Sequence, residues 1–268
     1  MNNNQTIHLM DAIVTAGGIP QLGEPLFEFT AGKPKAMLDF AGKPMIQWVL
    51  DALSISQHVS RVVVVGLPPL SAIRCAHPLT IIDTKGSILA NLKAGVEELQ
   101  RTGNITTKVL GVSSDIPGIT GPMVDWLIQS IQQTDHDLYY NVISRHLMEK
   151  QYPNSKRTYL QFKDMEICGG DINAFDYRMI FQKQKLFEQI IGFRKNPFKQ
   201  ASILGFDTLF LLLFKKMTLA QAEINISKKI GARGRALLCP YPEMGMDIDK
   251  SYQLEELLNS YLSNQESA

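Results

Sequence analysis

The sequence predicts an α/β protein with a doubly wound, mostly parallel central sheet flanked by helices. Short apolar runs alternate with amphipathic stretches through the first half of the chain, which is the order expected of successive strand–helix units. The run 61–66 consists largely of valine, which is typical of a strand buried on both faces, as in a parallel sheet. With 268 residues, 45% of them hydrophobic, the chain can form one sizeable core. We therefore expect a single domain over residues 1–268.

The first half is expected to hold strands and helices in alternation. The strands are short apolar runs, at 12–16, 61–66, 79–82, 108–112 and 138–143. The helices have apolar residues at helical spacing, and Pro44 suits the first turn of the earliest one; they lie at 45–53, 87–99 and 123–131. Strands in such an order pair in parallel, and ligands bind beyond their carboxyl ends.

The character of the sequence changes after about residue 145. The polar segment 151–164 contains Tyr159, Leu160 and Phe162, which indicate a strand of a small side lobe. A helix is expected at 176–191, with Asp176 as its N-cap.

The last elements are expected to be mainly helical. A helical stretch at 197–229 must break at Gly205 and near Thr218, where Thr218-x-x-Gln221 fits a capping box. A last strand is expected at 235–239. A closing helix follows at 252–262, with its leucines on one face.

Composition and charge exclude several classes of protein. The chain has 27 lysines and arginines and 26 aspartates and glutamates, a net charge of +1. The whole chain therefore lacks the excess of positive charge that is typical of proteins that bind nucleic acid or an anionic membrane. The three cysteines are far apart and form no C-x-x-C, so neither a disulfide framework nor a zinc site is expected. The apolar run 208–214 is far shorter than the ~20 residues of a membrane helix. The first five residues lack the pattern of a signal peptide, so a cytoplasmic protein is expected.

Two elements at the predicted carboxyl edge of the sheet suggest phosphate chemistry. Thr15-Ala-Gly-Gly18 follows the first strand, and glycines there let backbone amides approach a phosphate closely. Lys33, Lys35 and Lys43 then stand among glycines and prolines. About a hundred residues later, Asp115 follows the fourth strand and would lie at the same edge.

Together these segments resemble the MobA-like nucleotidyltransferases of GT-A fold. The first match combines 15–18 with Lys35-Ala-Met-Leu38 and Gly42-Lys-Pro-Met-Ile46. The second is Ser113-Ser-Asp-Ile-Pro117, followed by Thr120-Gly-Pro-Met-Val124. The third is Gly245-Met-Asp-Ile-Asp249 before a final helix. The resemblance covers most of the chain and implies a Rossmann-like fold with a small acceptor-side lobe.

The resemblance also implies the roles of individual residues. Lys35 would contact the phosphates of the nucleotide, and Lys35 and Asp115 would be the catalytic residues. Asp115 and Asp249 would hold Mg²⁺, with Asp247 as the alternative to Asp249. Mg²⁺ typically takes one or two carboxylates and completes its octahedron with phosphate oxygens and water.

Substrate-binding residues follow in the same way. The nucleotide would be bound by Ala16, Gly17, Gly18, Lys33, Lys35, Ser87 and Asn91, within a half formed by residues 6–145. The segment 169–175 resembles the acceptor-side glycine segment of the family, so Asp171 or Asn173 would contact the acceptor. The acceptor-side half would span 146–250, and 251–268 would form the closing helix and tail.

The expected function is transfer of a nucleoside monophosphate from an NTP to a phosphorylated small molecule, with release of pyrophosphate. Molybdopterin, a sugar 1-phosphate and a phosphorylated small alcohol all stay open as acceptors. The basic residues Arg145, Lys150, Lys156 and Arg157 are either a solvated face or a site for an anionic acceptor. The sequence leaves a homodimer open.

Two alternatives remain. The family's glycine loop normally carries an arginine, whereas this chain has none before Arg61, which favours a nucleotide-binding or regulatory protein without turnover. An NAD-dependent enzyme is supported only by the fold pattern, because no G-x-G-x-x-G follows the first strand.

Overall fold

The computed structural model describes residues 8–185, 187–188 and 216–266. One mixed sheet of nine strands runs through both halves of this part of the chain, in the order β5-β4-β1-β6-β10-β7-β9-β8, with β11 beside β7. Its first four strands are parallel neighbours: β5 (Leu79–Ile82), β4 (Val59–Val65), β1 (Met10–Thr15) and β6 (Lys108–Ser113). The structure thus confirms the mixed α/β class with a mostly parallel central sheet.

The remaining strands extend the sheet beyond β6. β10 (Ile172–Asp176) lies antiparallel between β6 and β7 (Leu138–Ser144). β9 (Glu166–Gly169) and β8 (Leu160–Gln161) continue antiparallel, whereas β11 (Gly234–Leu238) pairs with β7 in parallel. A separate two-stranded sheet joins β2 (Asp39–Phe40) to β3 (Lys43–Pro44).

Helices cover both faces of the sheet because alternate residues of each strand point to opposite faces. Ala12 and Val14 of β1 belong to a core cluster with α2 (Met45–Ile55) and α4 (Gly121–Gln132). Ile13, between them, packs into a second cluster with α3 (Ile88–Arg101) and α6 (Met179–Gln182). These two clusters form the doubly wound arrangement that the sequence predicts.

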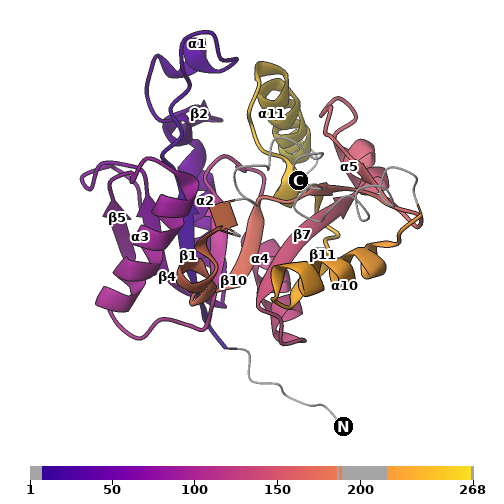
Figure 1. Ribbon diagram of the computed structural model, residues 1–268. Coiled ribbons are helices and arrows are strands. Elements are labelled where there is room, and N and C mark those ends of the chain that lie inside the picture. The colour runs from indigo at the N-terminus through magenta and orange to yellow at the C-terminus, as the bar shows by residue number, and fades with distance from the viewer. Residues whose placement is uncertain (1–7, 186, 189–215, 267–268) are drawn as a thin grey trace.

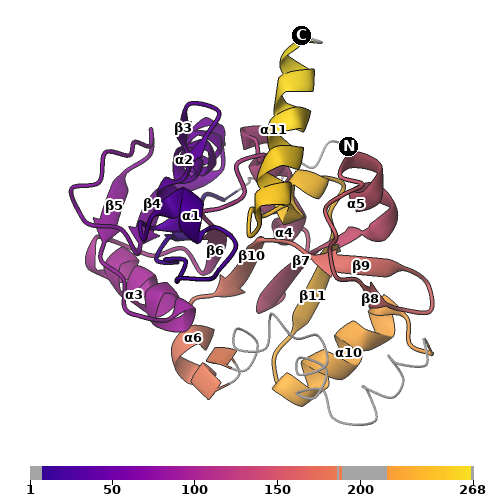
Figure 2. The ribbon, with the colours of Figure 1, turned by 90° about the horizontal axis from the view of Figure 1, so that it is seen from above.

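Two helices project beyond the edge of the sheet where β1 ends. Figure 1 shows α1 (Phe27–Thr30) and α11 (Ser251–Glu266) on that side, with η1 (Lys35–Met37) following α1 in the chain. α5 (Arg145–Gln151) and α10 (Leu219–Ile230) lie beside β7, β9 and β11, away from the parallel strands β4 and β5 (Figure 2). The short helix η2 (Pro242–Gly245) leads into the segment before α11.

The expected helix at 176–191 is wrong in its first part. Asp176 is the last residue of β10, and its carboxylate accepts hydrogen bonds from the backbone N–H and the guanidinium of Arg178. The helix there is α6, which begins only at Met179 and has no side-chain cap. Residues 189–191 lie outside the described residues.

The capping box at Thr218 is confirmed. The Thr218 hydroxyl accepts a hydrogen bond from the Gln221 backbone, and the Gln221 side chain accepts one from the Thr218 backbone, so α10 begins directly after Thr218. The other expected break, at Gly205, lies outside the described residues. Among the helices of the described residues, none is long and apolar enough to cross a membrane.

Candidate active site

The loops that follow four parallel strands meet at one edge of the sheet. Thr15 at the end of β1 lies opposite Ser113 of β6 on one side and Val65 of β4 on the other. Val65 in turn lies opposite Ile82 at the end of β5. This register brings the glycine segment, the segment after β5 and Asp115 to one edge, as expected of ligand sites in doubly wound sheets.

The glycine segment is held in a close-packed corner. The Ala16 N–H donates to the Val65 carbonyl at 2.8 Å. A Cβ on Gly17 would lie 2.8 Å from the Thr84 hydroxyl, and one on Gly66 would lie 2.2 Å from the Gly17 nitrogen. Gly66 also has φ +121°, a conformation that side chains disfavour. A larger residue at either glycine would push the loops apart.

Ser87 and Asn91 shape the loop beside this corner. The Ser87 side chain caps α3 by accepting from the Ala90 N–H at 3.1 Å. Asn91 is buried, and its Oδ1 accepts from the Lys85 N–H at 2.7 Å. Both side chains therefore support the segment that leads from β5 to α3, next to Gly17.

Three aspartates gather at the same edge. One carboxylate oxygen each from Asp115, Asp247 and Asp249 lies within 4.8 Å of the others. The segments meet because the Ile248 N–H donates to the Asp115 carbonyl at 3.0 Å. The Ser113 hydroxyl donates to Oδ1 of Asp115 at 2.5 Å, and so orients that carboxylate.

Lys35 reaches this acidic group from the other side. Its ammonium forms ion pairs with Oδ2 of Asp115 and, at 2.5 Å, with Oδ1 of Asp249. Its backbone N–H donates to the Gly18 carbonyl at 2.8 Å, which fixes the start of η1 against the glycine corner. Burial by itself would lower the pKa of Lys35, but the two carboxylates raise it above the usual range, so the side chain is cationic at neutral pH.

A second cation, Arg157, lies deeper in the site. Its guanidinium donates to Asp247 and, at 3.1 Å, to the Gly169 carbonyl, and it lies 3.7 Å from Oδ2 of Asp171. Although burial opposes its charge, Asp247 and Asp171 raise the pKa of Arg157. Arg157 thus links Asp247 of the acidic group to Asp171 and to the end of β9.

Two carboxylates of the site, those of Asp247 and Asp171, have raised pKa values. Burial raises the pKa of Asp247 to about 6; Arg157 opposes that shift, and the nearby carboxylates add to it. Burial and the charge of Asp247 raise the pKa of Asp171 well above its usual value. Oδ2 of Asp171 is buried without a hydrogen-bond partner in the structure.

These features fit a hard divalent cation. Each of the three aspartates in this group offers carboxylate oxygen, which Mg²⁺ prefers to sulfur or imidazole. The four carboxylates of Asp115, Asp171, Asp247 and Asp249 face two cations, so added positive charge would relieve their repulsion. The group of three aspartates could therefore bind a metal ion.

Other candidates lie further from this group or are engaged elsewhere. Lys33 is exposed, and none of the ion pairs within the described residues involves it. The Asn173 amide oxygen accepts from the Asn141 N–H at 2.8 Å, and its nitrogen donates to the Gly170 carbonyl at 3.2 Å. Asn173 therefore braces the sheet, whereas Asp171 lies beside the acidic group.

Sequence reasoning found Arg157 only as part of a basic stretch. Its contact with Asp247 joins a polar turn to a segment 90 positions later. No spacing or composition signal connects two such segments, so only the fold reveals the pair.

A cavity of about 260 Å³ lies beside Arg157, between α5 and the segment that leads to β8. Arg145, Lys156 and Arg157 line it together with Ser155 and Tyr159. Lys156 has φ +49°, in the left-handed region that few side chains adopt, which is typical of functional sites. Glu149 also lines the cavity and pairs with Arg145, and Arg157 pairs with Asp247, so Lys156 is the lining cation that could meet an anionic group.

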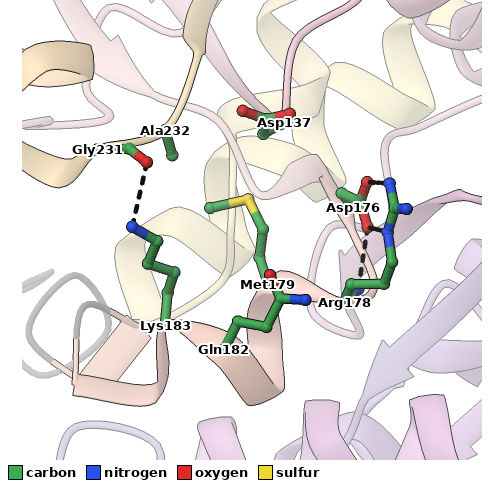
Figure 3. Close-up of a pocket in the computed structure, with 8 residues that line it drawn as sticks. All are labelled: Asp137, Asp176, Arg178, Met179, Gln182, Lys183, Gly231 and Ala232. Carbon is green, nitrogen blue, oxygen red and sulfur yellow. Dashed lines mark hydrogen bonds and ion pairs between the residues drawn. The ribbon is translucent and has the colours of Figure 1, made fainter.

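Another cavity, of about 240 Å³, lies at the opposite edge of the sheet, where β6 begins (Figure 3). Its charged groups are already paired: Asp176 binds Arg178, and the Lys183 ammonium donates to the Gly231 carbonyl at 3.1 Å. This cavity is therefore separate from the acidic group at the carboxyl edge.

Comparisons with known proteins agree with this fold. A family model described as a MobA-like NTP transferase domain matches residues 13–185. The solved structure of a hypothetical transferase from Thermus thermophilus is 29% identical to this chain. The match covers 92% of this chain and 99% of the other, with a TM-score of 0.75. A search of curated proteins finds no match.

Two more distant structures share the fold. A CMP:2-keto-3-deoxy-manno-octonic acid synthetase complexed with CTP is 16% identical, with 97% of this chain and 99% of its own covered and a TM-score of 0.59. A 2-C-methyl-D-erythritol 4-phosphate cytidylyltransferase, also from Thermus thermophilus, is 12% identical, with 96% and 99% covered and a TM-score of 0.51.

Proposed function

This chain belongs to the MobA-like NTP transferase family, and from that premise we propose that it is a Mg²⁺-dependent nucleotidyltransferase. The reaction moves a nucleoside monophosphate from an NTP to a phosphorylated small molecule and releases pyrophosphate. The observation that carries the proposal is the acidic group of Asp115, Asp247 and Asp249 with Lys35 against it, beside the glycine corner.

The residues present suit this reaction. A phosphate oxygen of the acceptor attacks the α-phosphorus, and the bond to the pyrophosphate oxygen breaks. Such a nucleophile is already ionised at neutral pH, so no general base is needed. Catalysis then rests on positioning and on neutralising charge. Bound Mg²⁺ would supply positive charge at the phosphates, held by Asp115 and Asp249 with Asp247 beside them.

The glycine corner and Lys35 would hold the triphosphate. The amides of Gly17 and Gly18 lie at the carboxyl edge, and the η1 backbone joins Lys35 to Gly18. We assign four further residues to nucleotide binding: Ala16, Lys33, Ser87 and Asn91. Residues 6–145 would thus form the nucleotide-binding half.

The second half, residues 146–250, would bind the acceptor, and 251–268 would close the site. The cavity lined by Arg145, Lys156 and Arg157 is the place that we assign to the acceptor's phosphate, because it adjoins the acidic group through Arg157. Replacing Lys156 with glutamine should raise the KM for the acceptor and leave the Kd of the nucleotide unchanged. A higher nucleotide Kd instead would place the cavity on the nucleotide side. Asp171 is the remaining acceptor candidate.

Names of the structural neighbours support the choice of substrates to test. One neighbour was solved with CTP, and another is named for a cytidylyl transfer to a phosphorylated alcohol. The first experiment is thermal unfolding with each of ATP, GTP, CTP, UTP and dTTP, with and without Mg²⁺, and with NAD as control. A ligand at about 100 times its Kd adds roughly 2.7 kcal/mol, which is about 5 °C for a chain of this size. A Mg²⁺-dependent shift with one NTP would name the donor.

Turnover then tests the catalytic residues. Lys35→Ala and Asp115→Asn should each lose roughly 10²–10³ in the rate of pyrophosphate release, the usual cost of one preorganised charge contact. Lys108→Ala is a matched control, because Lys108 begins the strand that Asp115 follows and lies at the opposite edge. Wild-type turnover in either site variant would refute the assignment.

The non-catalytic alternative makes a different prediction. It is favoured by the lack of an arginine before Arg61, and it requires nucleotide binding without pyrophosphate release from any acceptor. An NTP-dependent thermal shift with no turnover across sugar phosphates and phosphorylated alcohols would select it.

A further inference from the structure

Lys35 is one of the two cations at the acidic group, and Arg157 is the other. Its ammonium pairs with one oxygen of Asp115 and with one of Asp249, the two residues expected to hold the metal. The side chain is largely buried, with 15% of its surface exposed. In this conformation two of the three N–H donors of Lys35 are engaged by carboxylates, which leaves one for a phosphate of a nucleotide.

Lys35 and a metal ion would compete for the same two carboxylates, those of Asp115 and Asp249. Mg²⁺ binds oxygen at 2.0–2.1 Å, and an ammonium held by the same two carboxylates would lie within contact distance of it and repel it. We infer that Lys35 holds the place of the metal between the Asp115 and Asp249 carboxylates, and that metal binding releases its ammonium to the triphosphate. This inference rests on the proposed function and adds an exchange step to it.

The surroundings of Lys35 suit such an exchange. Its backbone stays fixed because its N–H bonds the Gly18 carbonyl, while the four-carbon side chain has free torsions. Ser113 holds Oδ1 of Asp115, so only Oδ2 changes partner. Arg157 holds Asp247 independently. The carboxylates therefore keep their positions when the ammonium leaves.

The exchange couples metal and nucleotide binding. A nucleotide that draws Lys35 away from the aspartates strengthens metal binding, and by linkage the metal strengthens nucleotide binding by the same factor. Without Lys35, the metal should bind more tightly in the absence of nucleotide, and the coupling should shrink to the part that direct contact between the metal and the phosphates supplies.

The test is a titration of the full chain with Mn²⁺, which can stand in for Mg²⁺ and is followed by EPR of the free ion. Without nucleotide, Lys35→Met should bind Mn²⁺ at least tenfold more tightly than wild type. The charge-matched control is Lys43→Met, because Lys43 lies on the same segment but pairs with Asp51. Lys43→Met should behave as wild type. Unchanged or weaker binding in Lys35→Met, or equal gains in both variants, would overturn the exchange.

A second measurement uses the wild-type protein and so does not depend on how a variant folds. Acetylation of each lysine, quantified by mass spectrometry, should be slow at Lys35 without metal and several-fold faster with Mg²⁺, while the rate at Lys43 stays constant. An acetylation rate at Lys35 that is the same with and without Mg²⁺ would overturn the inference.

Failure of the proposed function gives a distinct result. If Asp115→Asn leaves Mn²⁺ affinity unchanged, the acidic group is not the metal site, and the exchange falls with it. If Asp115→Asn weakens Mn²⁺ binding but Lys35→Met does not strengthen it, only the exchange is refuted, and pyrophosphate release still decides the proposed function.

Discussion

The buried ion pair between Arg61 and Asp11 offers a test of the fold that is independent of function. Asp11 is fully buried in β1, and the Arg61 guanidinium donates two hydrogen bonds to its carboxylate, at 3.0 and 2.7 Å. Arg61 also donates to the carbonyls of Leu99 and Asn104, at 3.0 and 2.9 Å. The pair thus ties β1 and β4 to the end of α3 and the loop beyond it.

Replacing Arg61 with methionine should destabilise the protein strongly. It would leave the Asp11 carboxylate with a single hydrogen bond, from the Thr106 N–H, in a place that water does not reach. Removing one partner of a buried pair costs about 3–5 kcal/mol. For a chain of this size this is a fall in Tm of about 5–9 °C.

Urea unfolding gives the assay, because a lower midpoint at constant slope reports a loss of stability. The double variant Asp11→Asn/Arg61→Met should recover part of the loss, since the orphaned charge is gone. Arg101→Met is the control, because that exposed arginine pairs only on the surface of α3, and its midpoint should match wild type. A loss for Arg61→Met below about 1 kcal/mol, the range of surface pairs, would refute the reasoning.

Three further predictions concern packing, capping and thiol reactivity. Gly95→Ala in α3 should cost about 1–3 kcal/mol in a denaturant melt, since its Cβ would lie 2.6 Å from Ile13; an unchanged melt would contradict the close contact. Thr218→Ala should cost about 1 kcal/mol by loss of the cap of α10, with Thr218→Ser as the near-neutral control. Burial raises the pKa of Cys239 to about 11, so its thiol stays protonated at pH 9 and should react with a thiol reagent far more slowly than half-buried Cys75. Comparable rates at the two cysteines in the folded protein would contradict this.

The sequence predicted the parallel half of the fold well because its signals are local. The strand 79–82 was placed with its observed bounds, and the capping box at Thr218 predicted the start of α10. Hydrophobic period and caps are properties of neighbouring residues, so they can be read without the rest of the chain.

The expected helix at 176–191 failed for the opposite reason. The strand 172–176 forms because β6 and β7 offer it partners on both sides, and both partners are more than 30 positions away in the chain. Asp176 resembled an N-cap, yet its carboxylate binds Arg178 two residues later. Tertiary pairing thus decided a segment whose local preference was weak.

In the candidate site, too, some residues could be predicted from the sequence and one long-range contact could not. Asp115, Asp249 and Lys35 came from motif resemblance, and the structure brings them into contact. The contact of Arg157 with Asp247 could not be predicted, because no local pattern records which distant carboxylate a buried guanidinium will reach.

The contact between Lys35 and Asp249 spans 214 positions of sequence, and this has a consequence for how the protein is made. A chain growing from its N-terminus presents the glycine corner and Asp115 long before residues 247–249 exist. Closing so long a loop carries an entropic cost that only the completed core can offset. Metal affinity should therefore emerge late in refolding, after the parallel strands have assembled. Time-resolved Mn²⁺ uptake would then report the last step of folding, and a shortened chain ending before residue 247 would lack it.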